Sequence, residues 1–443
     1  MRHNGSIEPC ESIDFVGGRV VDPSLDLDGI RTIVVRNGRV VALLDRAPST
    51  PDASVRRVDC AGMTMCPGFI DPHVHLREPG ESHKETLATG LAAAAAGGFT
   101  AVAAMPNTRP PLDDPSRVRQ LVRDADALRG TRCYPIGAVS VGRDGEALAP
   151  LRSLAAAGAV GYSDDGNCTK SLKTLYNAAL LTADLRQPFL SHCEDPSFAG
   201  ALIHEGSVSD RLGLAGTPAV SEAAVAARDL LVAQATGKAW HLCHVSARAT
   251  VAVLRWARSL SVRVTAEVTP HHLQCTDEAL LGFNARMRVN PPLRSADDVQ
   301  AMRAAVADGT ISIFASDHAP HSEEEKEAPL SRSCAGFSGL DVAVAATFDA
   351  LPDVPLRTML SNYSRNVAAL LGCGTGTLAI GAPADITGIY LDRPWVVDAR
   401  CFVSKGRATP FDGRRFKVRP ALTVVGGRVV FQSAAEVRAG GPL

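Results

Sequence analysis

The chain has 443 residues, enough to bury a large core in one barrel-sized unit with a smaller module beside it. Its 46 basic and 47 acidic residues nearly cancel, which disfavours a nucleic-acid-binding surface or a membrane-surface patch. We therefore expect a small-molecule partner, no nucleic acid and no membrane. The 11 cysteines are odd in number and form no Cys-x-x-Cys pair, so no disulfide framework is expected. The polar stretch 1–8 lacks the apolar segment of a secretory signal, and a reducing cytoplasm is the expected location.

Short β-type runs occupy both ends of the chain. Residues 18–21 and 32–35 are such runs near the start, separated by Asp-Pro and Asn-Gly turn signals. Similar runs return at 384–389 and 422–430. We expect the two groups to pair into one composite β domain. The predicted division of the chain is 1–66 and 377–443 for the two parts of this domain, with 67–376 forming a separate barrel.

Between the two ends, strand-like runs alternate with helical stretches rich in Ala, Leu and Arg. Such alternation is typical of βα units built around a parallel sheet. The stretch 91–105 falls short of the roughly 20 apolar residues that span a bilayer, and predicts a buried helix, a Gly-Gly turn and a buried strand. The strand-like runs number eight, as in a TIM (β/α)8 barrel, and lie at 68–75, 99–105, 132–138, 159–164, 188–192, 240–244, 263–269 and 311–317.

The first of these runs ends in a His-x-His pair, His73 and His75. Side chains alternate along a strand, so both imidazoles share one face and can bind one ion together. Four later runs also end in residues that bind metals: Asp165, His192, His244 and Asp317. The carboxyl ends of barrel strands meet at one rim, where TIM-barrel active sites lie. The sequence therefore predicts a metal site at this rim.

Four imidazoles and two carboxylates exceed the needs of one tetrahedral zinc ion and match two ions that share a bridging group. Asp165 can supply one oxygen to each metal, in which case the neighbouring Asp164 should point the other way. Two divalent ions would lower the pKa of a bridging water toward about 7 and leave a positive pocket suited to an anionic substrate. Asp317 is the candidate proton carrier between the hydroxide and a leaving nitrogen, a role compatible with metal ligation.

Three polar residues near these ligands suit an anionic substrate. Arg77 lies two residues beyond His75, so in an extended chain it would share the face of the ligands and offer a fork to a carboxylate. Asn107 follows the second strand and can donate an amide hydrogen, with a surface turn as the alternative. His321 lies four residues past Asp317 and can add a donor, with a structural role as the alternative.

Eight segments together closely resemble dihydroorotases of the long, bacterial type within the amidohydrolase superfamily, and the resemblance runs from about residue 15 to 432. The segments are 68–80 (GFIDPHVHLREPG), 105–108, 163–166, 192–195, 241–246, 267–273, 290–294 and 317–321 (DHAPH). The resemblance implies reversible cyclisation of N-carbamoyl-L-aspartate to L-dihydroorotate with loss of water, the third step of pyrimidine (UMP) synthesis. A homodimer and an association with aspartate carbamoyltransferase stay open.

The resemblance also implies roles for individual residues. One zinc ion would take His73, His75, Asp165 and Asp317, and a second would take Asp165, His192 and His244, with Asp165 and a hydroxide as the bridges. Asp317 would be the general acid and base. The implied substrate-binding residues are His75, Leu76, Arg77, Asn107, Asn290, His321, Ala335 and Gly336, the last two acting through their backbone beyond a mobile loop.

The chain departs from the pattern of related families at two positions. Many relatives bridge their metals with a carboxylated Lys at the end of the fourth strand, where this chain has Asp165. Lys170 lies five residues later and is disfavoured as the bridge. Asp341 stands where a Glu is expected, a shortening that could loosen a contact behind the site.

Several other His, Cys and charged residues are expected to have structural roles rather than to bind a metal ion. His271 and His272 occupy adjacent positions of the seventh predicted strand, so packing is favoured over metal ligation. Cys193 and Cys243 adjoin ligand-bearing strands and are expected to be small buried hydrophobes. The charged run 323–327 is expected to be a solvated loop, and the loop 322–334 around it is a candidate lid.

Two other functions stay open. One is hydrolysis of a different cyclic amide, such as a hydantoin or allantoin, which Arg77 disfavours because those rings lack the carboxylate that it would bind. The other is a catalytically silent, dihydroorotase-like scaffold for another pyrimidine enzyme. Loss of ligands would be the signature of such a scaffold, and all six candidate ligands are present.

Overall fold

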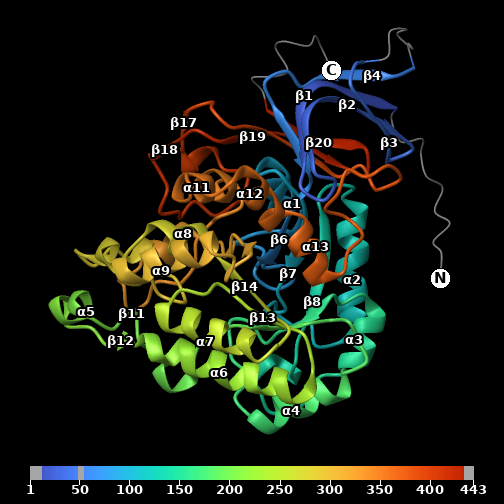
Figure 1. Ribbon diagram of the computed structural model, residues 1–443. Coiled ribbons are helices and arrows are strands. Elements are labelled where there is room, and N and C mark those ends of the chain that lie inside the picture. Colours follow the sequence, from blue (N-terminus) through green and yellow to red (C-terminus); the bar gives the residue numbers. More distant parts are fainter. Residues whose placement is uncertain (1–11, 48–53, 434–443) are drawn as a thin grey trace.

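A parallel barrel of eight strands forms the centre of the computed structural model, which describes residues 12–47 and 54–433 (Figure 1). The strands lie in chain order around the barrel: β6 (Phe69–Val74), β7 (Phe99–Ala104), β8 (Arg132–Gly137), β9 (Gly161–Tyr162), β10 (Phe189–Ser191), β13 (Trp240–Leu242), β14 (Val264–Val268) and β15 (Ile313–Phe314). A parallel bridge between Val74 and His318 closes the ring. The predicted TIM barrel is confirmed, with each strand inside its predicted range.

The shortest barrel strands are β9 and β15, which stop earlier than predicted. Ser163 and Ala315 still donate backbone hydrogen bonds to the neighbouring strand, at 2.9 and 3.2 Å. Beyond them the chain leaves the ladder, and Asp317 adopts a positive φ of 47°. These departures let Asp165 and Asp317 turn into the mouth of the barrel, which a longer regular strand would not allow.

Helices cover the outside of the barrel strands (Figure 1). The longer ones are α1 (Leu87–Ala96), α2 (Pro115–Ala127), α3 (Leu151–Ala157), α4 (Leu172–Leu181), α6 (Ala219–Thr236), α7 (Arg248–Ser259), α9 (Ala296–Ala307), α11 (Ala343–Ala350), α12 (Leu356–Tyr363) and α13 (Arg365–Leu371). The segment 91–105 contains the expected helix, Gly-Gly turn and buried strand. No helix in the described ranges is long and apolar enough to cross a membrane.

Shorter elements decorate the loops. They are α5 (Ser207–Leu212), α8 (Pro270–Gln274), α10 (Glu323–Glu327), the strand pairs β11 (Ile203–His204) with β12 (Gly216–Thr217) and β17 (Trp395–Val396) with β18 (Arg415–Phe416), and 3-10 turns at Val141–Arg143, Pro196–Phe198, Asp277–Leu280, Ala285–Met287 and Ala399–Cys401. Two of these elements, α8 and α10, lie where the sequence predicted a strand and a loop, respectively.

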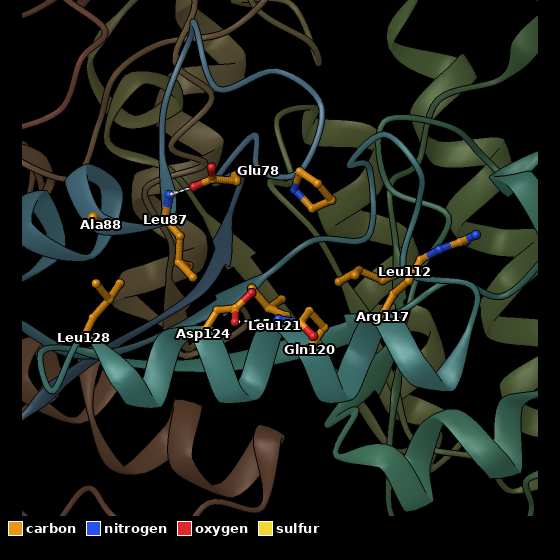
Figure 2. A pocket seen from close by; sticks show the side chains of 10 residues that line it. Glu78, Leu87, Ala88, Leu112, Arg117, Gln120, Leu121, Asp124 and Leu128 are labelled. Carbon is orange, nitrogen blue, oxygen red and sulfur yellow. Dashed lines mark hydrogen bonds between the residues drawn. The ribbon is translucent and has the colours of Figure 1, made fainter.

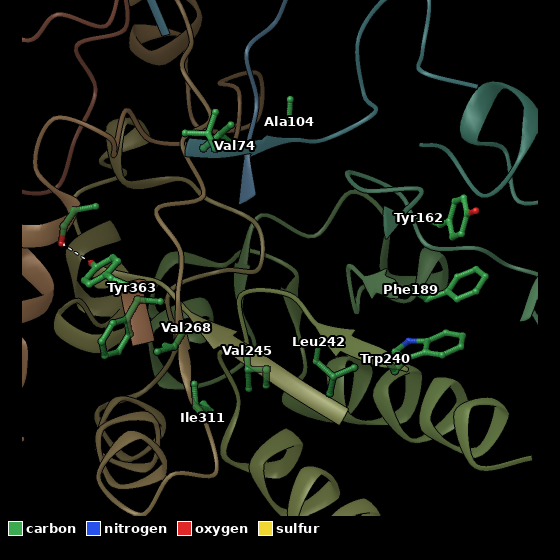
Figure 3. Packing of buried hydrophobic residues seen from close by; sticks show 14 of the residues in the cluster. Val74, Ala104, Tyr162, Phe189, Trp240, Leu242, Val245, Val268, Ile311 and Tyr363 are labelled. Carbon is green, nitrogen blue, oxygen red and sulfur yellow. Dashed lines mark hydrogen bonds between the residues drawn. The ribbon is translucent and has the colours of Figure 1, made fainter. Parts of the chain in front are cut away.

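Aromatic rings fill much of the space between the barrel and its helices (Figure 3). Phe189 and Trp240, from neighbouring strands, stack with ring centroids 4.8 Å apart, and Tyr162 lies 5.5 Å from Phe189. On the other side Tyr363 of α12 packs on Phe314, with centroids 5.0 Å apart. These large apolar contacts hold the strand ends in place by burial.

A second sheet combines strands from both parts of the chain (Figure 1). Its order is β20 (Arg428–Gln432), β19 (Arg419–Val425), β16 (Ile386–Tyr390), β5 (Thr64–Pro67), β1 (Ile13–Asp22), β2 (Leu27–Arg36) and β3 (Arg39–Leu44), with β4 (Arg56–Asp59) also paired to β1. The antiparallel pairing of β5 with β16 joins the early strands to the late ones. The expected composite β domain is confirmed, whereas its exact boundaries stay a prediction.

The composite sheet meets the barrel at the amino ends of the barrel strands. Thr387 Oγ1 donates to the Gly98 carbonyl at 2.7 Å and accepts from the Phe69 amide at 3.1 Å. Arg132, at the start of β8, pairs with Asp385 at 3.1 Å. This junction leaves the opposite, carboxyl ends of the strands free to build a site.

A buried carboxylate, Glu85, ties the segment after β17 to the barrel. It accepts hydrogen bonds from Ser404 Oγ at 2.5 Å and from the Lys405 amide at 3.3 Å, and it lies 3.3 Å from His318 Nε2. Asp341, which stands where a Glu was expected, accepts from the Val403 amide at 2.7 Å. Both carboxylates thus hold residues 403–405 against the barrel rim.

The turn after α1 provides a test of close packing. A Cβ added to Gly97 would clash with the backbone carbonyl oxygen of Leu340, which cannot move like a flexible side chain. We expect Gly97→Ala to lower the free energy of unfolding by about 1–3 kcal/mol, the range for overpacked sites. Gly374→Ala is the matched control, because an added Cβ there meets nothing within 4 Å, and its denaturant unfolding should match the wild type. Equal stability of the two variants would contradict the packing described.

The Glu85 contacts predict a pH-dependent contribution to stability. Burial opposes ionisation of Glu85, but the hydrogen bond and charge of His318, with the hydroxyls of Ser404 and Thr89, outweigh it and lower the pKa from 4.5 to about 2. The ionised carboxylate therefore stabilises the fold above pH 4.5, and this stabilisation is lost as the pH falls toward 2.

We expect Glu85→Gln to be less stable than the wild type at pH 7 by on the order of 3 kcal/mol. The difference between the two proteins should shrink as the pH falls from about 4.5 toward 2, because protonation removes the same charge from the wild type. Urea unfolding at pH 7 and near pH 3 measures both values. A difference that does not change with pH would show that the charge of Glu85 contributes nothing.

Candidate active site

The predicted ligand residues meet at the carboxyl ends of the barrel strands. Asp165 lies at their centre: its Oδ1 is 3.3 Å from His73 Nε2, 3.4 Å from His192 Nδ1 and 3.7 Å from His244 Nε2. Its Oδ2 is 3.5 Å from His75 Nε2. All five side chains are buried. The two oxygens of Asp165 therefore face different imidazoles, as a bridging carboxylate would.

Asp317 completes the cluster from the opposite side. Its Oδ1 lies 3.2 Å from His75 Nε2 and 3.6 Å from His73 Nε2. Within the described ranges, His73, His75 and Asp317 form one group whose ligand atoms all lie within 4.8 Å of one another, and His73, Asp165 and His244 form another. The structure thus brings together all six predicted ligand residues.

The donor atoms of this cluster fit metal ions. His73 Nε2 and Asp165 Oδ1 are buried and make no hydrogen bond among the described residues, although buried polar atoms are normally satisfied. Imidazole nitrogens and carboxylate oxygens are the donors that zinc accepts from proteins. A cation between these atoms would satisfy both, so the residues present fit a metal site.

The charges in the cluster also favour a cation. Burial opposes ionisation of Asp165, but the charge of His73 and the close imidazoles of His192 and His244 outweigh it and hold its pKa well below the usual value. Burial lowers the pKa of His73, yet the negative charges of Asp165 and Glu267 outweigh it and raise that pKa well above the usual value. The same negative field that retains a proton on His73 would stabilise a metal ion.

Asp164 faces away from the cluster, as expected. Its carboxylate accepts hydrogen bonds from the Val139 and Ser140 amides, both at 3.0 Å, and from Thr169 Oγ1 at 2.8 Å. It therefore holds the loop after β8 and leaves the bridging position to Asp165. Lys170, disfavoured as a bridge, has an exposed side chain and joins neither group of ligand atoms.

A layer of carboxylates behind the cluster was missed in the sequence. Glu267 on β14 contacts His73 Nδ1 at 2.7 Å and His241 Nε2 at 2.9 Å, and it accepts from the His244 amide at 3.1 Å. Asp71 accepts from the His73 amide at 3.1 Å, and burial raises the pKa of Asp71 to about 7. An acidic residue inside an otherwise apolar barrel strand was the signal available for both.

Glu194 is a further carboxylate to which sequence reasoning gave no role. Its Oε2 lies 2.9 Å from His192 Nε2, and its Oε1 accepts from Asn290 Nδ2 at 3.5 Å. Burial lowers the pKa of His192, but the nearby carboxylate of Asp165 and the hydrogen bond that His192 donates to Glu194 outweigh it and raise the pKa to about 10. Glu194 thus orients the imidazole whose other nitrogen faces Asp165.

A cavity of about 190 Å³ opens over the cluster. Seven of the eight predicted substrate-binding residues line it: His75, Arg77, Asn107, Asn290, His321, Ala335 and Gly336. Leu76 is the exception, because its neighbours His75 and Arg77 face the cavity while its own side chain packs into the hydrophobic core. Any contact of Leu76 with a ligand would have to come from its backbone.

Arg77 reaches the cavity by a different route from the one predicted. Its φ is 60°, so the chain is not extended there, and the argument from an alternating strand was wrong. The side chain is nevertheless buried at the site: Nε donates to the Pro320 carbonyl at 3.1 Å, and a terminal nitrogen lies 3.2 Å from His321 Nε2. Burial and the charges of Arg77 and Lys84 lower the pKa of His321 to about 2, so this imidazole is neutral.

His271 and His272 do not lie on a strand, which corrects the prediction. They belong to the first turn of α8, where Thr269 caps the helix and Pro270 occupies its first position. His272 Nε2 contacts the Pro291 carbonyl at 3.0 Å, and His271 packs on Phe337 with ring centroids 5.1 Å apart. Both rings are buried in packing contacts, and neither belongs to a group of possible metal ligands among the described residues.

The remaining structural expectations differ in outcome. Cys193 and Cys243 are buried free thiols, and burial raises the pKa of each, so both stay protonated. Cys243 also groups with His73 and Glu267 within 4.8 Å. The run 323–327 is not a solvated loop but the short helix α10, in which the Lys326 side chain is fully buried. Whether the loop 322–334 acts as a lid stays a prediction.

A larger cavity, of about 470 Å³, lies away from these residues, between α1 and α2 (Figure 2). Its walls are mostly apolar, with Leu87, Leu112 and Leu121 among them, and Glu78 accepts from the Leu87 amide at 2.7 Å at one side. It contains none of the clustered imidazoles or carboxylates. The chemistry available to the chain is therefore at the smaller cavity.

Known proteins resemble this chain in sequence and in fold. Residues 62–250 match the family described as dihydro-orotase-like. A dihydroorotase of Syntrophus aciditrophicus is 41% identical over 419 residues, covering 94% of this chain and 98% of that protein. A dihydroorotase of Pelotomaculum thermopropionicum is 44% identical over 420 residues, covering 94% and 97%.

Solved structures share the fold at lower identity. An L-hydantoinase (dihydropyrimidinase) from Arthrobacter aurescens superposes with a TM-score of 0.83 at 24% identity, covering 95% of this chain and 96% of that chain. A D-hydantoinase (dihydropyrimidinase) from Thermus sp. gives 0.79 at 20% identity, covering 95% of each. At this level of identity, these structures support only the fold, which comprises the barrel and the composite sheet. The near-full-length identity to the two curated relatives goes further, and it shows that the chain belongs to the dihydroorotase family.

Proposed function

We propose that the chain interconverts N-carbamoyl-L-aspartate and L-dihydroorotate, the third step of pyrimidine synthesis, with two zinc ions per chain. The observation that carries the proposal is the meeting of four imidazoles around Asp165 and Asp317, directly beside the guanidinium of Arg77. The relatives named dihydroorotase support the reaction. Cytoplasmic location, a homodimer and an association with aspartate carbamoyltransferase stay predictions.

The distances support a division of the ligands between two ions. One ion would be held by His73, His75, Asp165 and Asp317, and the other by Asp165, His192 and His244. Asp165 suits the shared position because its Oδ2 faces His75 while its Oδ1 faces His192 and His244. When bound, the ions would polarise the amide carbonyl and lower the pKa of a water molecule.

Asp317 is the proposed proton carrier. In ring opening its carboxylate would accept a proton from the attacking water and deliver it to the leaving ring nitrogen, and cyclisation would reverse both transfers. Burial opposes ionisation of Asp317, but the hydrogen bond from His75 and the charges of His73 and His244 hold its pKa below the usual value. The carboxylate therefore lines the cavity in the ionised form that accepts a proton.

The opposite wall of the cavity suits the substrate's α-carboxylate. Arg77 supplies a positive charge, His321 contacts its guanidinium, and Asn107 also lines the cavity. Asn107 Oδ1 lies 2.8 Å from His75 Nδ1, so its amide group is already oriented toward the site. Asn290, Ala335 and Gly336 line the same cavity and would contact the ring.

Hydrolysis of a hydantoin or allantoin is the second candidate, because the solved structures that share the fold are hydantoinases. Those rings would leave the buried Arg77 without an anionic partner, and a buried unpaired charge is costly. The geometry therefore favours a substrate that carries a carboxylate next to the scissile amide.

Ring-opening assays on L-dihydroorotate, hydantoin and allantoin test the substrate. We expect turnover of L-dihydroorotate to exceed that of the other two by at least about a hundredfold, since an unpaired site charge rejects analogues strongly. Metal analysis of the purified protein should find roughly two zinc ions per chain, the stoichiometry of a two-metal site. An inactive protein without bound metal would instead support the non-catalytic scaffold.

Replacement of the proposed proton carrier tests the chemistry. Asp317→Asn should lower kcat by about 10²–10⁴-fold, the usual contribution of a positioned acid or base. Asp353→Asn is the control, because it makes the same change on an exposed residue far from the cavity. Thermal unfolding checks that both variants fold. If Asp317→Asn kept wild-type turnover, another group would have to carry the proton.

A further inference from the structure

Lys326 is a fully buried lysine on α10, near the cavity but not part of its lining. Its Nζ donates to the Arg288 carbonyl and to the Cys334 carbonyl, both at 2.9 Å. The ammonium also lies 5.3 Å from the ring centroid of Phe337. Burial lowers the pKa of Lys326 to about 7. Burying an ammonium costs free energy, and an apolar side chain of similar length could fill the same space without that cost. The presence of a lysine here therefore suggests that its hydrogen bonds have a specific role.

The two carbonyls belong to segments that form the cavity wall. Arg288 stands two residues before Asn290, and Cys334 directly precedes Ala335 and Gly336. Asn290, Ala335 and Gly336 all line the cavity. Lys326, which lies outside the cavity lining, therefore donates hydrogen bonds to both backbone segments that would face the substrate, 288–290 and 334–336.

Other contacts make this wall a single unit. The Gly336 amide donates to the same Arg288 carbonyl at 3.0 Å, and the Cys334 amide donates to the Glu325 carbonyl at 3.1 Å. The Ala335 carbonyl lies 2.9 Å from His321 Nε2, on the cavity side. A shift of segment 334–336 would also move His321, which the Ala335 carbonyl contacts. His321 in turn contacts the guanidinium of Arg77.

We propose that Lys326 is a positioning residue for substrate binding, which acts by tying the backbone of 288–290 to that of 334–336. This inference rests on the proposed function of the cavity. The six ligand residues sit on the ends of barrel strands that Lys326 does not contact, so the chemical groups stay in place without it. Loss of the ammonium should therefore weaken substrate binding much more than it slows the chemical step.

A second buried lysine provides a matched control. Lys238, which is 2% exposed, donates to the Thr182 and Leu185 carbonyls at 2.5 and 2.6 Å. It too spans two backbone carbonyls, and burial lowers its pKa as well, to about 8. Lys238 lies outside the lining of the cavity and precedes β13 at the amino end of that strand. Its replacement should destabilise the fold without touching the substrate wall.

Steady-state kinetics on L-dihydroorotate with the zinc-loaded enzyme test the proposal. Lys326→Met should raise KM at least about tenfold while kcat changes less than about threefold, the pattern of a lost binding interaction. Lys326→Arg keeps donors for both carbonyls but places a larger head group in a fully buried site, so it should recover only part of the lost affinity. Lys238→Met should leave KM unchanged.

Two outcomes would overturn the role of Lys326: a wild-type KM in Lys326→Met, or an equal rise of KM in Lys238→Met. A wild-type enzyme inactive on dihydroorotate would instead count against the proposed function itself.

Lys326→Gln is the second variant if Lys326→Met does not fold, because it removes the ammonium and its shorter amide cannot bond both carbonyls as the ammonium does. It should also raise KM with little change in kcat. A folded Lys326→Gln enzyme with wild-type KM would overturn the proposal.

Discussion

The buried carboxylate of Asp165 is the group on which the rest of the site depends. Removing a carboxylate from water costs several kcal/mol unless partners compensate. Here the partners are imidazoles that follow three other barrel strands, β6, β10 and β13, and β6 lies far from the other two in sequence. Only a closed ring of parallel strands brings their carboxyl ends around one point. The barrel is therefore both the scaffold of the cluster and the condition for burying its central charge.

Charge is arranged in layers outward from this point. Glu267 and Asp71 lie behind His73 and fix its orientation through its ring and its backbone amide. Asp165 and Asp317 follow, and the negative field of these carboxylates favours cations in the centre. The local charge is positive at the cavity wall, because the guanidinium of Arg77 lies there beside a neutral His321. A substrate that is anionic at one end and an amide at the other matches this sequence of charges.

Much of this arrangement could be predicted from the sequence because strand ends carry unusual residue types. The eight strand ranges followed from the alternation of strand-like and helical runs, and the composite sheet followed from the β-type runs at both ends of the chain. The six candidate ligands followed from the His and Asp residues that end five of the barrel runs. The errors came where local geometry overrides periodicity. Thr269 caps a helix that begins at Pro270, and Arg77 adopts a positive φ, neither of which an alternating pattern reveals.

Side chains that act on the site from behind were the hardest to foresee. Glu267 sits within an apolar run, and its partners His73 and His241 are distant in sequence, so only the fold shows the contact. The charged run 323–327 looked solvated because four of its five residues are acidic. Tertiary contacts with two backbone segments bury its one lysine instead. Sequence patterns thus identify the residues that line the site more readily than the buried residues that hold those side chains and backbone segments in place.

The composite sheet has a consequence for how the chain matures on the ribosome. Phe69 and Thr387, bonded where the two parts of the sheet meet the barrel, are 318 residues apart. At a translation rate of about 5–20 residues per second, roughly 15 to 60 seconds pass between synthesis of β5 and synthesis of β16, the strand that pairs with its open edge. Unpaired strand edges recruit other chains, so nascent copies on one polysome are exposed to mispairing during that interval. The rate of elongation therefore sets how long this edge stays open.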